Sequence, residues 1–146
     1  MNAKLKVIGY WLTTGLFAAA FLASGAAELT GAPAAVTATV ALGYPAYVLA
    51  ILGVWKVLSV PALLAPRLPR LKEWAYAGIF FDLTGAAVSH AVTGASLGTI
   101  ATPLVLLVLA GASWALRPPS RTWTSDASLP KRAHAATSLE NARAHV

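Results

Sequence analysis

The sequence predicts an all-α membrane protein, a bundle of four transmembrane helices with both termini in the cytoplasm. Of its 146 residues, 58% are hydrophobic and 11% are charged, whereas about 25% of residues are charged in soluble domains. The apolar residues form four runs, each close to the roughly 20 residues that a helix needs to cross a bilayer. The spans expected within this single domain (1–120) are residues 7–27, 45–65, 74–92 and 99–116.

Charge and cysteine content narrow the possible partners. The net charge of +6 comes from basic residues that gather at the ends of the runs, not among exposed aromatic residues on a folded surface, so we expect the lipid bilayer as partner and no nucleic acid. The chain has no cysteine, which excludes disulfides and thiolate metal sites. We predict no metal site, and electron transfer would require a bound cofactor or another subunit.

The first span begins beside Lys4 and Lys6, which indicates a cytoplasmic start. A cleaved signal peptide is an alternative interpretation, but the apolar run is longer than the usual 7 to 15 residues. At about 100° per residue, the spacing of the residues gives this helix a patterned face. That face contains Thr14, Phe17, Phe21, Ser24, Gly25 and Glu28.

Loops without Lys or Arg alternate with basic ones along the rest of the chain. The connection 29–44 has no Lys or Arg and contains Gly31 and Pro33, so we expect an external loop there. The second span starts at Pro45 and carries Lys56 near its middle. The loop 67–72 has three basic residues and is expected in the cytoplasm.

The third span, entered at Trp74, carries Gly78, Asp82, Gly85 and Ser89 on one side. This spacing predicts a stripe that packs against another helix, with Phe80, Leu83 and Ala87 facing lipid. The loop 91–98 is again uncharged and external, and the fourth span has no polar centre. Residues 121–146 are rich in Pro, Ser, Thr and Ala and are expected to form a disordered cytoplasmic tail.

Lys56 and Asp82 are the candidate functional residues at mid-membrane. Each lies about 12 to 14 Å from the cytoplasmic end of its span, and pairing is the least costly way to keep both charges in the membrane. The pair either fixes the packing of two helices or serves as a proton relay or ligand anchor. Trp55 and Ser89 are candidate ligand contacts.

Glu28 and His90 form a second polar set, expected near the outer ends of their helices. At that depth they either pair with each other or face water. The sequence contains no two-histidine metal motif, no nucleotide-binding glycine loop and no nucleophile motif, so no catalytic residue is assigned.

Several segments together resemble the DoxX-like family of small bacterial membrane proteins. They are L-G-Y-P at 42–45, I-L-G-V-W-K at 51–56, R-L-K-E-W-A-Y-A-G at 70–78, F-F-D-L-T-G-A-A-V-S-H at 80–90 and W-A-L-R-P-P at 114–119. The resemblance implies a four-helix bundle in the bacterial cytoplasmic (inner) membrane. The family name derives from a subunit of a thiosulfate:quinone oxidoreductase, and members often carry lysine where this chain has Glu28.

Two functional hypotheses follow. The first is an accessory or anchoring subunit of a membrane oxidoreductase complex, with a separate catalytic partner subunit and, by family resemblance, quinone as the cofactor near Trp55, Lys56 and Asp82. The second is a stand-alone transporter or proton-coupled carrier that uses Glu28, Lys56, Asp82 and His90, although no inverted repeat is evident.

Overall fold

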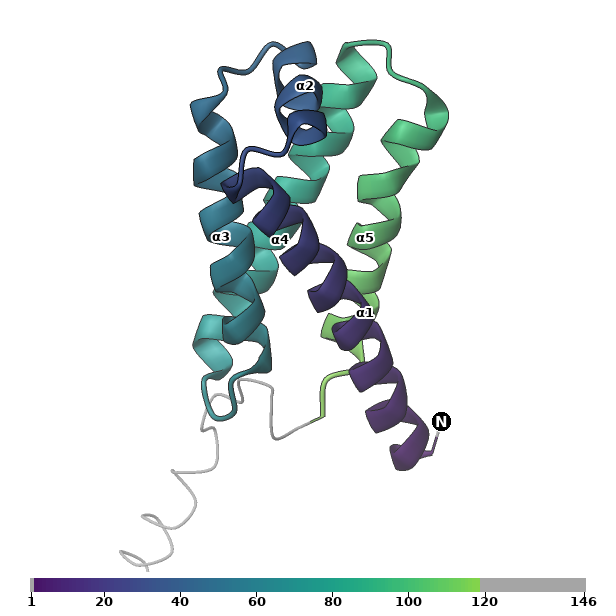
Figure 1. Cartoon of the computed structure of the whole chain (residues 1–146). Coiled ribbons are helices and arrows are strands. Elements are labelled where there is room, and N and C mark those ends of the chain that lie inside the picture. The colour runs from purple at the N-terminus through teal and green to yellow at the C-terminus, as the bar shows by residue number, and fades with distance from the viewer. Residues whose placement is uncertain (1, 119–146) are drawn as a thin grey trace, which may run out of the picture.

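The computed structural model describes residues 2–118, and this part of the chain is all α-helical (Figure 1). Its helices are α1 (Ala3–Leu29), α2 (Pro33–Ala41), α3 (Tyr47–Leu64), α4 (Pro69–Val92) and α5 (Leu97–Ala115). The tail expected over 121–146 lies outside the described residues. The closest packing joins α1 to α3 and α4 to α5, whereas α3 and α4 touch more sparsely.

The short helix α2 corrects the prediction of a loop over residues 29–44. Pro33 occupies its first turn, where the missing N–H of proline costs nothing. Gly31 and Gly43, both with positive φ (63° and 86°), reverse the chain on either side of it. Nine residues rise only about 14 Å, so α2 is too short to cross a bilayer.

The tilt of α1 explains where α2 lies. Figure 1 shows α1 crossing the bundle diagonally, with its C-terminal end beside α3 and α2 above that end. We call the end of the bundle with Lys4, Lys6 and the α3–α4 connection the basic end. Helix α1 starts at the basic end and finishes before it reaches the opposite end of the bundle. Helix α2 occupies the space between the end of α1 and that opposite end.

Helix α4 begins at Pro69, five residues before the expected start of the third span at Trp74. Lys72, expected in an aqueous loop, is instead 1% exposed. Its Nζ donates to the carbonyl oxygens of Leu63 and, at 3.4 Å, Ala62. A lysine in this position satisfies carbonyl groups that have no partner at the C-terminus of α3.

The buried face of α4 also differs from the prediction. Tyr76, Ile79, Leu83 and Ala87 are buried, whereas Leu83 and Ala87 were expected to face lipid. A Cβ added at Gly78 or Gly85 would meet nothing within 4 Å, so these glycines do not pack against a helix. The predicted small-residue stripe was therefore wrong as a helix contact.

The core lies where α1, α3, α4 and α5 meet, and it includes Phe17, Phe21, Leu63 and Ile79. The face of α1 predicted from periodicity supplies Phe17 and Phe21. Toward the basic end, three hydroxyl groups form a buried chain: Ser113 Oγ lies 2.6 Å from Thr14 Oγ1 and 2.7 Å from Tyr76 Oη. Each hydroxyl thus has a partner in an environment where an unpaired polar group is costly.

Three described helices are long and apolar enough to cross a membrane: 4–29, 47–64 and 97–115. They confirm an all-α membrane protein. Helix α4 is 24 residues long but more polar, because it contains charged residues near its start together with Asp82 and His90. Its Glu73 also binds Arg117 beyond α5, with 2.8 Å between Oε1 and Nη2.

Candidate functional site

Lys56 is the centre of a partly buried cluster of charges contributed by three helices. Its Nζ forms an ion pair with Glu28 Oε1 of α1 and lies 3.8 Å from Asp82 Oδ2 of α4. The three side chains are between 11% and 18% exposed. Ser24 Oγ, 3.4 Å from Lys56 Nζ, donates to Glu28 Oε1 at 3.2 Å. Phe21 covers the ammonium, with 5.6 Å from Nζ to the ring centroid.

Two glycines set the contact between Glu28 and Lys56. A Cβ added at Gly25 of α1 would lie 2.9 Å from Lys56 Cβ, and one added at Gly53 of α3 would lie 2.9 Å from Gly25 O. Only residues without a side chain allow the two backbones to come this close. Glu28 and Lys56 follow these glycines by three residues each, which brings both to the same helix crossing.

The structure thus brings Lys56 and Asp82 together but places Glu28 differently from the prediction. Glu28 was expected at the outer end, beside His90 or in water. Instead it lies against Lys56, because the tilted α1 ends inside the bundle. Among the described residues, no ion pair or hydrogen bond links Glu28 to His90. Ser89 also lies elsewhere: its hydroxyl is 2.8 Å from Tyr44 Oη.

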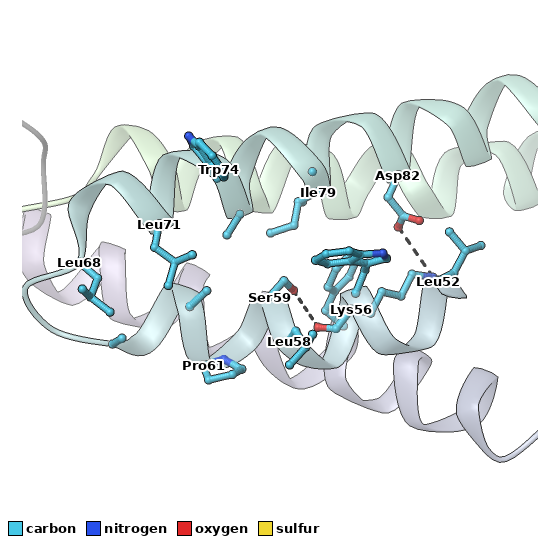
Figure 2. Close-up of a pocket in the computed structure, with 16 residues that line it drawn as sticks. Leu52, Lys56, Leu58, Ser59, Pro61, Leu68, Leu71, Trp74, Ile79 and Asp82 are labelled. Atoms are coloured by element: carbon cyan, nitrogen blue, oxygen red, sulfur yellow. Dashed lines mark hydrogen bonds and ion pairs between the residues drawn. The ribbon is translucent and has the colours of Figure 1, made fainter. Parts of the chain in front are cut away.

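A groove of about 840 Å³ runs between α3 and α4 from the cluster toward the basic end. Figure 2 shows Leu71 and Ile79 pointing from α4 toward α3, with Asp82 and Lys56 joined at one end. The lining is largely hydrocarbon and aromatic. Trp55 and Trp74 line the groove and are 68% and 80% exposed, so the groove opens sideways, toward the lipid.

A second cavity, of about 540 Å³ and more open to the surface than the groove, lies on the other side of the cluster and also reaches Lys56 and Asp82. We call it the polar cavity, because seven of its thirteen described lining residues have hydroxyl, imidazole or charged side chains, against three of sixteen in the groove. These seven are Ser24, Lys56, Asp82, His90, Ser96, Thr99 and Thr102. His90 therefore belongs to the same site as Glu28, through a shared cavity and not by direct contact.

The cluster has unequal numbers of acidic and basic groups. Two carboxyl groups share one ammonium, and Glu28 Oε2 is buried without a hydrogen-bond partner. Within the described residues, no group of three or more His, Cys, Asp or Glu side chains is arranged to hold a metal ion. The arrangement is suited to binding a polar head group, or a proton, next to an apolar groove.

Trp55, a candidate ligand contact from the sequence, lines the groove together with Lys56 and Asp82. The rest of the groove wall and the Glu28–Lys56 contact were missed. Leu52, Leu58 and Leu71 carry no signal that separates a groove from a lipid face. The Gly25 and Gly53 pair was a usable signal, because small residues mark close helix crossings.

Residues 12–113 match the model of the DoxX-like family. The chain belongs to the DoxX-like family. The match runs from α1 to α5 and includes Glu28, Lys56, Asp82 and the linings of both cavities. It confirms the resemblance inferred from the sequence motifs. No curated protein and no solved structure matches this DoxX-like chain, so its functional interpretation depends on its own geometry.

Proposed function

We propose that this DoxX-like protein is an accessory or anchoring subunit of a membrane oxidoreductase complex in the bacterial inner membrane, and that its groove binds a membrane-dissolved ligand of the quinone type. The observation that carries the proposal is the groove between α3 and α4, with apolar walls and an ion-paired end. Its volume of about 840 Å³ lies in the range of small-molecule sites.

The chemistry of the groove favours an amphipathic ligand. The hydrocarbon and aromatic side chains suit an isoprenoid or acyl chain, and they would contribute affinity through burial of apolar area. Lys56 Nζ is a hydrogen-bond donor at the closed end, and Asp82 is an acceptor or, when protonated, a donor. A quinone head group has two carbonyl oxygens that match such donors. The lateral opening beside Trp55 and Trp74 gives a membrane-dissolved molecule a way in.

The membrane arrangement proposed for this role has four spans, with α4 as the fourth. Helix α4 lies alongside α5, and its 24 residues rise about 36 Å, enough to cross a hydrocarbon core. Lys72 donates to backbone carbonyl groups, and Asp82 lies 3.8 Å from the Lys56 ammonium. All Lys and Arg residues of the described chain other than Lys56 lie toward the basic end, which favours a cytoplasmic location for that end.

Cysteine labelling tests this topology. Single cysteines at Ala38 and Gly94 are expected to react with an impermeant thiol reagent in intact cells, and a cysteine at Arg70 only after lysis. The natural chain contains no cysteine, so it serves directly as the unlabelled control. If only Arg70→Cys were labelled in intact cells, the basic end would face outward and the proposed orientation would be wrong.

Ligand binding is testable by blocking the groove. Gly78 lines the groove, and a side chain added there meets no atom within 4 Å. We expect Gly78→Leu to fold normally and to weaken binding of a short-chain ubiquinone by at least about tenfold, or about 1.4 kcal/mol. Binding would be measured as the saturable quenching of tryptophan fluorescence in mild detergent.

Gly85→Leu is the matched control, because Gly85 is on the same helix, has equally free space around it and lies outside the groove lining. Equal quenching of both variants and the wild type would contradict the groove as the binding site. Copurification of a redox subunit in mild detergent would support the accessory role.

The second candidate function, a proton-coupled carrier, is favoured by one observation: cavities approach Lys56 and Asp82 from two directions. A carrier needs such access from both sides of a central site. Solute uptake into proteoliposomes that contain this chain alone, driven by a pH gradient and lost in Lys56→Met, would support the carrier over the accessory subunit.

A further inference from the structure

We propose that the polar cavity is a water-filled route by which the cluster of Glu28, Lys56 and Asp82 exchanges one proton with the aqueous phase at the end opposite the basic end. The proposal concerns the cavity on the far side of the cluster and does not require a ligand in the groove.

The charge balance of the cluster calls for one more positive charge. Glu28 and Asp82 both contact Lys56, so the fully ionised cluster has a net charge of −1. An uncompensated charge near mid-membrane costs about 2.5 to 3.5 kcal/mol on insertion scales. The other described groups around the cluster are neutral hydroxyls and the His90 imidazole. A single proton held by one of the two carboxyl groups removes the excess charge.

The polar cavity has the polar lining that such a route needs, and it extends along α4 from Asp82 to His90. Asp82 and His90 both line it and are eight residues apart on α4, or about 12 Å along the helix axis. Ser24, Ser96, Thr99 and Thr102 add hydroxyl groups from α1 and α5 and the turn before it. Pro103 has no N–H, so the carbonyl of Thr99 also lacks its usual helical donor. A cavity of this size with several polar partners can hold water.

The groove provides no comparable route, because its only described polar side chains besides the cluster are Ser59 and the indole groups of its tryptophans. The Ser59 hydroxyl donates to the carbonyl of Lys56 at 2.7 Å. Proton exchange is therefore assigned to the polar cavity, and ligand entry to the groove.

Thiol accessibility tests for water in the polar cavity. Ala86 lines it, whereas Val88, two residues further along α4, is 61% exposed on the outer surface of the bundle. Because the reactive thiolate forms in water, we expect Ala86→Cys to react with a charged methanethiosulfonate at least about ten times faster than Val88→Cys. Thr102→Cys and Val105→Cys form a second matched pair on α5, with Val105 59% exposed. Equal rates within both pairs would overturn the water route.

Infrared spectroscopy tests for the bound proton. We expect the wild type to show one protonated-carboxyl band in the membrane-embedded region that shifts in D2O. Asp82→Asn or Glu28→Gln should remove this band, since either leaves one carboxylate for one ammonium. Lys56→Met should about double it, because both carboxyl groups then need a proton. A wild-type spectrum without an exchangeable band, or a Lys56→Met spectrum identical to it, would overturn the proposal. Neither measurement involves quinone, so failure of the groove proposal would be seen separately.

Discussion

Replacing Lys56 with methionine is expected to lower the free energy of unfolding by about 2 to 4 kcal/mol, because two partly buried carboxyl groups lose their shared cation. Because the carboxyl groups can take up protons, the loss of stability should be smaller than the cost of leaving two unpaired negative charges in the membrane. Reversible unfolding by SDS in mixed micelles gives the measurement. Lys6→Met, which removes an exposed lysine of α1, is the control and should change stability by less than about 0.5 kcal/mol.

Double-mutant cycles then separate the two partners of Lys56. The coupling with Glu28 should exceed the coupling with Asp82, because Glu28 Oε1 is in hydrogen-bond contact whereas Asp82 Oδ2, at 3.8 Å, is beyond it. The variants are Glu28→Gln and Asp82→Asn, each alone and with Lys56→Met. Additive losses in both cycles would show that the cluster does not exist. A larger coupling for Asp82 would show that Glu28 is not the main partner.

The depth of a charge in an apolar run was predictable, and the tilt of a helix was not. Counting residues from the basic loop places Lys56 and Asp82 at one depth, and the structure has them 3.8 Å apart. The same counting failed for Glu28, because it treats every helix as upright and full length. Helix α1 is tilted and ends inside the bundle, and residues 33–41 have no periodic pattern that would distinguish α2 from a loop.

The lipid-facing and buried sides of a membrane helix are also hard to separate by composition. Lipid chains are as apolar as a protein core, so Leu83 suits either side, and its burial depends on the position of α1 and α5. A glycine in a membrane helix is equally ambiguous, because it can mark either a close helix contact or an open space. Gly25 and Gly53 allow backbones to touch, whereas Gly78 leaves open space that becomes part of the groove.

The second large effect is expected from adding one methyl group at Gly53. The new Cβ would lie 2.9 Å from Gly25 O and from Leu29 Cγ, and 3.1 Å from Glu28 Cβ. One of these neighbours is backbone, so α1 and α3 must move apart. We expect Gly53→Ala to lower the free energy of unfolding by about 1 to 3 kcal/mol, the usual cost of overpacking. It should also weaken quinone quenching, because the Glu28 contact that orients Lys56 is stretched.

Gly15→Ala on α1 gives the matched comparison, because a Cβ there meets nothing within 4 Å. In a helix, alanine is favoured over glycine by about 0.8 to 1 kcal/mol, so this variant should be unchanged or more stable. Only Gly53→Ala is thus expected to destabilise the protein, a difference that intrinsic helix propensity cannot produce. Gly25→Ala combined with Gly53→Ala should cost less than the sum of the single changes, since helices already separated by one methyl group accommodate the second more easily. If Gly15→Ala and Gly53→Ala both raised the free energy of unfolding by the same amount, α1 and α3 would not cross closely at Gly53. Glu28 and Lys56 would then not be held together by that crossing.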